Sequence, residues 1–376
     1  MQLFVLNLIW TQTKVKFPMP LRQQTLFDTD DRNWFNIQFP STRYQGSKRK
    51  LTDWLWSNVK DLPFSTGLDV FGGTGAVSHL FKRHGKQVTY NDTLKFNWQI
   101  GVALIQNAET TITAEDLGLI LDRQTNIAYP NFIYRTFSDI YFTDAENQWL
   151  DQIVFNIDHF IKDPIKQALA RFALFQSCII KRPYNLFHRA NLYMRHAAVE
   201  RSFGNKHSWD TAFEIHFRLF IAEANAAVFD NHCLNSALNL DAGDTPIGSD
   251  LVYLDPPYLN AKGVGVNYYD FYHFLEGLVN YDTWGSQIDF KSRHKRLIPK
   301  PSPWMRPNSI LSAFETVIDR HQNSIIVISY RDNGVPSRKA LIDLLKYYKP
   351  TVTEVVQDQR YVLATQASRE MLLIGR

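Results

Sequence analysis

Cysteine is scarce in this chain of 376 residues, which contains only Cys178 and Cys233. Two thiols exclude a disulfide framework and every zinc site that is built from several cysteines. We therefore expect both thiols to be buried, no metal site, and a protein of a reducing, cytoplasmic compartment.

Long apolar runs are also missing. Residues 1–10 are apolar, but a segment this short cannot span a bilayer. It has neither the basic start nor the small-residue cleavage site of a signal peptide. We expect no contact with a membrane, and the choice between Met1 and Met19 as the start stays open.

The composition is otherwise that of an ordinary globular protein. Hydrophobic residues make up 45% of the chain and charged residues 21%, and the length suffices for two domains. The formal net charge of +4 permits a nucleic-acid partner without requiring one. The positions of the basic residues along the chain must show whether the protein has a nucleic-acid partner.

The most informative stretch is the run of apolar residues from Leu251 to Leu254, which leads directly into Asp255, Pro256, Pro257 and Tyr258. An uninterrupted apolar run predicts a strand that is buried on both faces of a parallel sheet. The prolines end that strand because they lack a backbone N–H and have a fixed φ. Asp255 is thereby expected at the carboxyl end of a strand, where open α/β sheets bind ligands.

This arrangement suits a planar amino group. The Asp255 carboxylate and a neighbouring prolyl carbonyl accept hydrogen bonds, and the Tyr258 ring can stack on whatever carries the amine. Two acceptors would localise the lone pair of the amine toward an electrophile and would stabilise the positive charge that develops on nitrogen as it attacks. The alternative interpretation is a simple strand-ending turn.

A glycine-rich turn occurs earlier, between a short apolar strand and an amphipathic helix. Gly72, Gly73 and Gly75 let the backbone turn sharply and approach a ligand closely. A dinucleotide fingerprint is the alternative, but Ser78 stands where its third glycine belongs. The next predicted strand, residues 87–90, ends at Asp92, which can accept hydrogen bonds from ribose hydroxyls or can be a turn residue.

Strand patterns then disappear from about residue 94 to 232, where helical periodicity dominates. Residues 181–195 contain four Lys or Arg and no acid, and a second polar loop covers residues 202–209. Basic groups pair with phosphates, and Arg and Asn can read base edges, although a solvated helix face is the alternative. The predicted nucleic-acid contacts are Lys181, Arg182, Asn185, His188, Arg189, Asn191, Arg195 and Lys206.

The order of these motifs is similar to that of the Dam-like (DPPY-type) adenine-specific DNA methyltransferase family. The segment Tyr44-Gln45-Gly46-Ser47-Lys48 resembles its opening motif, residues 69–75 resemble its glycine loop, and Asp255–Tyr258 resembles its catalytic motif. The resemblance covers nearly the whole chain after residue 40. It implies S-adenosylmethionine as the methyl donor, bound by Tyr44, Lys48, Asp69, Phe71, Gly72, Gly73, Thr74, Gly75, Asp92, Asp241 and Asp255. The match at Asp241 is loose, and Asp244 or Asn235 are alternatives.

The expected fold is α/β, with a Rossmann-like mixed, mostly parallel sheet flanked by helices and an inserted, mainly helical target-recognition domain. Residues 1–40 form an amino-terminal extension, residues 41–107 and 233–376 the methyltransferase domain, and residues 108–232 the recognition domain. The implied catalytic residues are Asp255, Pro256, Pro257 and Tyr258. They would methylate adenine N6 in a specific double-stranded DNA sequence after base flipping, by direct displacement and without a metal.

Other functions stay open at this point. A dinucleotide-dependent oxidoreductase would explain the glycine loop and Asp92, but not the amine-binding tetrapeptide. A DNA-binding regulator would explain the basic segments, but not the cofactor loop. RNA is a further alternative substrate, and the sequence leaves open the oligomeric state and whether a cognate restriction endonuclease accompanies the protein.

Overall fold

The computed structural model describes residues 33–197, 206–359 and 368–376. Trp34–Arg376 forms one compact unit. Most of the predicted extension at residues 1–40, and residues 202–205 of the second polar loop, lie outside the described residues. None of the described helices is long and apolar enough to cross a bilayer.

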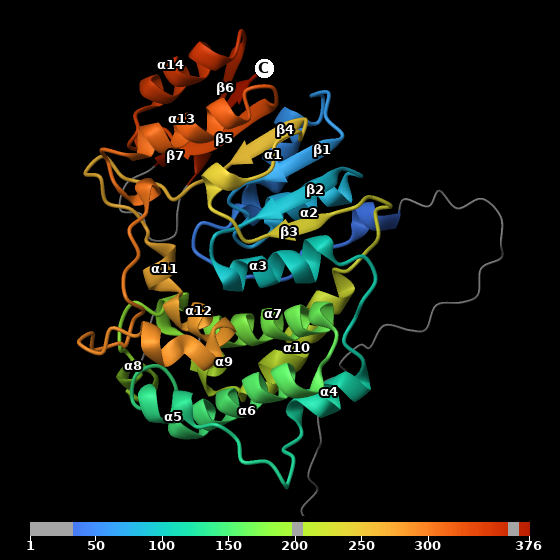
Figure 1. Cartoon of the computed structure of the whole chain (residues 1–376), viewed down its shortest axis with the longest axis vertical. Coiled ribbons are helices and arrows are strands. Elements are labelled where there is room, and N and C mark those ends of the chain that lie inside the picture. Colours follow the sequence, from blue (N-terminus) through green and yellow to red (C-terminus); the bar gives the residue numbers. More distant parts are fainter. Residues whose placement is uncertain (1–32, 198–205, 360–367) are drawn as a thin grey trace, which may run out of the picture. The chain divides into compact units, whose positions relative to one another are not determined.

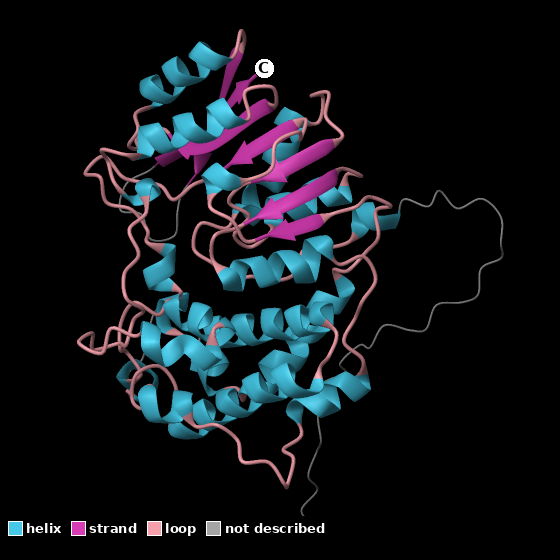
Figure 2. Ribbon diagram, in the orientation of Figure 1, coloured by secondary structure: helices cyan, strands magenta, loops and turns pink. Residues whose placement is uncertain are grey.

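A seven-stranded sheet with the order β3-β2-β1-β4-β5-β7-β6 forms the centre of the unit (Figures 1 and 2). Neighbours from β3 to β5 pair in parallel, whereas β7 is antiparallel to both β5 and β6. The strands are β1 (Thr66–Asp69), β2 (Gln87–Asn91), β3 (Ser236–Leu238), β4 (Leu251–Leu254), β5 (Ile325–Arg331), β6 (Val352–Gln359) and β7 (Ser368–Gly375). The predicted mixed, mostly parallel sheet is confirmed.

The apolar run of β4 is buried on both sides, as its sequence predicts. Leu251 and Tyr253 belong to the larger hydrophobic cluster, which also contains residues of α1 (Thr52–Val59), of α2 (Ala76–Arg83) and of the helices of the insertion. Val252 and Leu254 belong to the second cluster, with α13 and α14. Alternate side chains of one strand therefore anchor two helical layers.

Helices flank the sheet (Figure 2). They are α1 (Thr52–Val59), α2 (Ala76–Arg83), α3 (Lys95–Gly101), α13 (Ile310–Arg320) and α14 (Arg338–Tyr348). Two further helices after β4, α11 (Tyr268–Phe271) and α12 (His273–Val279), lie away from the sheet, and α12 packs against α3 and α7 (Figure 1). A π-helical turn, Val102–Gln106, extends α3.

The insertion between β2 and β3 is helical, as predicted. It contains α4 (Ala114–Leu121), α5 (Phe132–Thr136), α6 (Asp144–Phe160), α7 (Pro164–Ile180), α8 (Tyr193–His196), α9 (Lys206–Asp210) and α10 (Phe213–Ala226). Thr143 caps α6 in a capping box with Glu146, and Asp163 caps α7 ahead of a proline at its first turn. Helix α3 lies between β3 and α7 (Figure 1), and one hydrophobic cluster runs from the sheet into the insertion.

The strand order reverses at β1, whose neighbours are β2 and β4. Asp69, the last residue of β1, pairs with Tyr253, so Asp255 lies two residues further on at the same edge. Asp92 directly follows β2 at that edge as well. This topology brings three carboxylates from distant parts of the sequence to one end of the sheet, where doubly wound folds bind their ligands.

Candidate active site

A cavity of about 650 Å³ opens at this edge of the sheet. Every predicted cofactor residue except Gly75 lines it: Tyr44, Lys48, Asp69, Phe71, Gly72, Gly73, Thr74, Asp92, Asp241 and Asp255. Of the catalytic tetrapeptide, Asp255 and Pro257 are lining residues, whereas Pro256 is buried. The two motifs that the sequence analysis joined thus face one common space.

The glycine turn has no room for a side chain at Gly72 and has left-handed backbone at Gly73 and Gly75. A Cβ at Gly72 would lie 2.0 Å from the Tyr90 ring, and Gly73 has φ +52°. The Gly73 N–H donates to Asp92 Oδ2 at 2.9 Å, so the acid after β2 fixes the turn after β1. Burial, which outweighs these hydrogen bonds, raises the pKa of Asp92 to about 6.

Asp69 is almost completely buried at this edge. The Ser78 hydroxyl donates to its Oδ2 at 2.7 Å, whereas Oδ1 has no hydrogen-bond partner among the described residues. Burial raises the pKa of Asp69 to about 7. Ser78 occupies the position of the third glycine of a dinucleotide fingerprint. Its side chain forms a hydrogen bond with Asp69, whereas a glycine there would allow the helix to pack closely on the strand.

Tyr44 forms an aromatic stack with α11 and α12. Its ring is parallel to those of Tyr272 and Tyr268, with centroid distances of 4.5 and 5.4 Å. The amide of Asn97 in α3 donates to the Tyr44 hydroxyl at 3.3 Å and to Asp92 at 3.1 Å. Asn97 and Tyr268 are lining residues that the sequence analysis missed. A single Asn in a predicted helix carries no distinguishing pattern, and Tyr268 lies in an aromatic run of the kind that usually packs into a core.

The alternatives for the acid near the cofactor adenine are separated by position. Asp241 lines the cavity, and the Thr93 hydroxyl donates to its Oδ1 at 3.0 Å. Asp244 and Asn235 are not lining residues, and Asn235 instead accepts the backbone N–H of Val88 at 2.9 Å. Of the three residues, only Asp241 lines the cavity. On the opposite side, Phe71 packs edge-to-face on Trp304 at 4.8 Å, so the segment 300–305 closes the cavity there.

Asp255 is bonded within the protein. Lys48 Nζ lies 2.7 Å from both of its carboxylate oxygens, and the Tyr258 hydroxyl donates to Oδ1 at 2.8 Å. Burial and the neighbouring Glu370 raise the pKa of Asp255, although Lys48 opposes them. Burial alone would lower the pKa of Lys48, but Asp255 and Glu370 outweigh it and raise that pKa.

The orientation of Tyr258 corrects the predicted stacking role. Its ring is not part of the cavity lining, and its hydroxyl also lies 2.6 Å from Glu370 Oε1. The ring packs edge-to-face on Tyr330 at 4.8 Å. In this conformation Tyr258 therefore supports the carboxylate instead of presenting a face to a base.

The geometry agrees with a comparison with known families. A model of the D12 class N6 adenine-specific DNA methyltransferase family matches residues 44–285. The chain belongs to this family. It is a site-specific adenine DNA methyltransferase, and the prediction drawn from the motif order is confirmed over the oxidoreductase, the regulator and an RNA substrate.

Individual relatives extend the match along most of the chain. The type II methyltransferase M2.HphI of Haemophilus parahaemolyticus is 29% identical over 344 residues, which cover 89% of this chain and 96% of the relative. M.NlaIII of Neisseria lactamica is 23% identical over 78% of this chain and 84% of its own length. M.FokI of Planomicrobium okeanokoites is 24% identical over 81% of this chain, which spans 46% of that longer relative.

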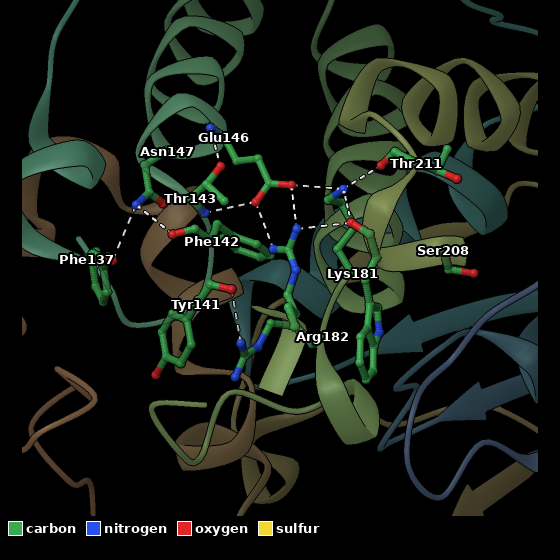
Figure 3. Close-up of polar contacts among 12 residues, drawn as sticks. Phe137, Tyr141, Phe142, Thr143, Glu146, Asn147, Lys181, Arg182, Ser208 and Thr211 are labelled. Atoms are coloured by element: carbon green, nitrogen blue, oxygen red, sulfur yellow. Dashed lines mark hydrogen bonds and ion pairs between the residues drawn. The ribbon is translucent and has the colours of Figure 1, made fainter. Parts of the chain in front are cut away.

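The basic segment of the methyltransferase is largely internal, which corrects four predicted DNA contacts. Lys181, Arg182, Asn191 and Arg195 are all buried. Arg195 forms a bidentate ion pair with Glu146, with both N–O distances at 2.8 Å. Lys181 Nζ lies 2.9 Å from the same carboxylate (Figure 3). The sequence showed no acid in this segment because the neutralising acid comes from α6.

Arg182 is a buried cation that forms hydrogen bonds with several parts of the chain. Its guanidinium donates to the carbonyls of Tyr141, Leu186 and Arg189 and to the side chain of Asn191. Complete burial lowers its pKa to about 9. The loop after α7 is therefore shaped by a buried cation, and Tyr184 and Asn185 adopt left-handed φ values of 62° and 59° within it.

The remaining predicted contacts lie closer to solvent. Arg189 and Lys206 are exposed, and Asn185 and His188 are half-buried. Lys206 pairs with Asp210 one helical turn away at 2.7 Å, and the His188 ring stacks on Phe271. Tyr193, which the sequence analysis did not select, is 71% exposed on the same segment.

Two smaller expectations have mixed outcomes. Cys178 is buried as predicted, whereas Cys233 is half-buried at the start of the return to the sheet, so the expectation of a buried thiol is wrong there. No group of three or more potential metal ligands occurs among the described residues.

Proposed function

We propose that the cavity binds S-adenosylmethionine, which supplies a methyl group on a sulfonium centre when bound. The residues that would hold it are Tyr44, Lys48, the backbone of residues 71–75, Asp92 and Asp241. Several features support the fit: a cavity of about 650 Å³, a glycine turn that has no room for a side chain at Gly72, and the unpartnered Asp69 Oδ1 beside it. Acidic acceptors at the tips of adjacent strands are the groups that bind ribose hydroxyls.

We further infer that Asp255 receives the exocyclic amine of a flipped adenine. Rotating a base out of the duplex costs a few kcal/mol, and the cavity beside Asp255 offers the space for it. Asp255 and a prolyl carbonyl would then accept the two N–H bonds and orient the nitrogen for attack on the methyl carbon. The N–C bond forms as the S–C bond breaks, and Asp255 is placed to accept the proton that the nitrogen releases.

The insertion at residues 108–232 is the proposed DNA recognition region. Arg189 and Lys206 would pair with phosphates, and Asn185 and His188 would lie near the bases. The exposure of Arg189 and Lys206 and the partial exposure of Asn185 and His188 support this assignment, as does the continuous core that fixes the insertion to the sheet. Phosphate contacts set the register on the duplex and base contacts carry the sequence information.

Three relatives carry the name type II methyltransferase. We propose the same setting for this chain, in which methylation of one recognition sequence protects it from a companion endonuclease. The recognition sequence itself would follow from the experiment below.

The convergence of Asp69, Asp92 and Asp255 on one cavity beside the glycine turn is the observation that carries the proposal. The test is to express the protein in cells that lack adenine methylation and to sequence modified bases in their DNA. We expect N6-methyladenine in one sequence context, its loss in Asp255→Asn, and cofactor binding by that variant within a few-fold of wild type by calorimetry. Methylation that survives in Asp255→Asn would contradict the assignment of the catalytic acid.

A further inference from the structure

Glu370 is a buried acid that contacts the residues around Asp255 but has not been given a part in the proposed reaction. It lies on β7, the one antiparallel strand, and is completely inaccessible to solvent. The Tyr258 hydroxyl lies 2.6 Å from its Oε1 and the Ser329 hydroxyl donates to the same atom at 2.5 Å. Lys48 Nζ lies 3.6 Å from that oxygen. Two of these three neighbours, Lys48 and Tyr258, also bind Asp255.

Asp255 already has two donor groups in the conformation that the structure shows. Lys48 occupies both carboxylate oxygens at 2.7 Å, and Tyr258 adds a further donor to Oδ1. In the proposed complex one hydrogen of the base amine is directed at Asp255 and the other at a prolyl carbonyl, so the amine competes with these donors for the acceptor sites of the carboxylate. Lys48 is 6% exposed, and leaving a buried ammonium without a partner would be strongly unfavourable.

Glu370 offers the departing donors a new acceptor at a short distance. The Lys48 ammonium is already within 3.6 Å of it. The Tyr258 hydroxyl contacts both carboxyl groups but has a single hydrogen, which it can donate to only one of them at a time. Both groups can therefore turn from Asp255 to Glu370 without entering solvent.

We propose that Glu370 is a positioning residue for methyl transfer. It takes over the Lys48 ammonium and the Tyr258 hydroxyl when the target amine replaces them on Asp255. This inference rests on the proposed role of Asp255. It adds a second carboxyl group, contributed by the last strand, that keeps the first one available.

The exchange has a signature in the pH dependence of the reaction, because Asp255 must be ionised to accept the amine. The negative charge of Glu370 raises the pKa of Asp255. Removing that charge should therefore move the acidic limb of the rate profile to lower pH. The other titratable groups that face Asp255 stay unchanged in such a variant: Lys48, Asp69, Tyr253, Tyr258 and Tyr268.

The test uses Glu370→Gln in the full-length enzyme, with single-turnover methylation of DNA at saturating S-adenosylmethionine. We expect the rate of transfer to fall at least ten-fold, because Lys48 stays on Asp255, and the acidic limb to shift to lower pH. Calorimetric affinity for S-adenosylmethionine should stay within about three-fold of wild type, which also shows that the variant is folded. Glu370→Asp, which keeps the charge, should recover part of the rate without the shift in the limb.

Asp151→Asn is the matched control, because Asp151 is a buried acid that also accepts a tyrosine hydroxyl, that of Tyr281, but lies outside the cavity. It should lower stability and leave the pH limb of transfer in place. Wild-type rate and an unmoved limb in Glu370→Gln would overturn the inference. So would equal rate losses in Glu370→Gln and Asp151→Asn with neither limb moved. Failure of the wild-type enzyme to label DNA would instead contradict the proposed function.

Discussion

Lys48 and Asp255 are 207 positions apart in the sequence, yet the ammonium of one lies 2.7 Å from the carboxylate of the other. The contact joins the opening motif to the tip of β4. It places a cation on the group that must hold the target amine. Removing this cation should therefore affect both the stability of the protein and the pH dependence of catalysis.

Lys48→Met tests the pair directly. The variant leaves Asp255 and Glu370 buried without their cation, so we expect the free energy of unfolding to fall by about 3–5 kcal/mol. Since Lys48 lowers the pKa of Asp255, the acidic limb of any remaining activity should move to higher pH. Denaturant titrations and pH–rate profiles measure the two effects. Lys339→Met, which removes an exposed pair with Asp343, should change stability by less than about 1 kcal/mol.

Asp69 should make stability depend on pH. Its pKa of about 7 lies above its ordinary value of 3.8, so folding favours the protonated form. The stability that it contributes is fully present below the ordinary pKa and is lost as pH rises through about 7, by at most about 1.4 kcal/mol per pH unit. The advantage of Asp69→Asn over wild type in unfolding free energy should grow through this window and then level off.

Ser78→Ala provides the complementary measurement for Asp69. The Ser78 hydrogen bond lowers the pKa of Asp69, so its loss should extend the pH window upward. A flat difference between Asp69→Asn and wild type from pH 4 to 8 would contradict the burial of this acid.

Gly72→Ala should damage the cofactor loop. The added Cβ would lie 2.0 Å from the ring of Tyr90, which is itself fully buried and cannot move away. We expect a loss of about 1–3 kcal/mol in unfolding free energy and at least ten-fold weaker binding of S-adenosylmethionine by calorimetry. Gly118→Ala, in helix α4 with only ordinary contacts, should instead stabilise the protein by about 0.5–1 kcal/mol. Unchanged cofactor affinity in Gly72→Ala would show that the loop tolerates a side chain.

Arg182 and Arg189 lie in one loop but should behave oppositely. Arg189→Ala removes an exposed charge, so DNA binding should weaken and the dependence of log affinity on log salt should lose about one unit of slope, with little change in stability. Arg182→Ala removes a fully buried brace, so the free energy of unfolding should fall by about 3–5 kcal/mol. Filter binding at several salt concentrations and thermal melts separate the two. The reverse assignment of effects would place Arg182 at the interface.

The central strand and the motif order could be predicted from the sequence because each has a local signal. The uninterrupted apolar run before Asp255 requires burial on both faces, and the glycines before Ala76 require a turn. These signals define two central strands and place both predicted motifs on the cavity. The helical character of the insertion follows equally from periodicity.

The partners of charged side chains could not be predicted in this way. Arg182 and Arg195 look like a basic surface in the sequence because Glu146 and the carbonyls that neutralise them lie elsewhere in the chain. Glu370 carries no motif, and its relation to Asp255 depends on the pairing of β7 with β5. Long-range pairing determines the charge balance of a site, and local patterns do not report it.

The position of β7 also determines the order in which the strands of the sheet can pair. It lies between β5 and β6, although it follows both in the chain. Strand β6 has no partner in the sheet other than β7 among the described strands, so it can join the sheet only once β7 has paired with β5. Glu370 belongs to β7, so the same pairing step that completes the sheet also brings the second carboxyl group to Asp255.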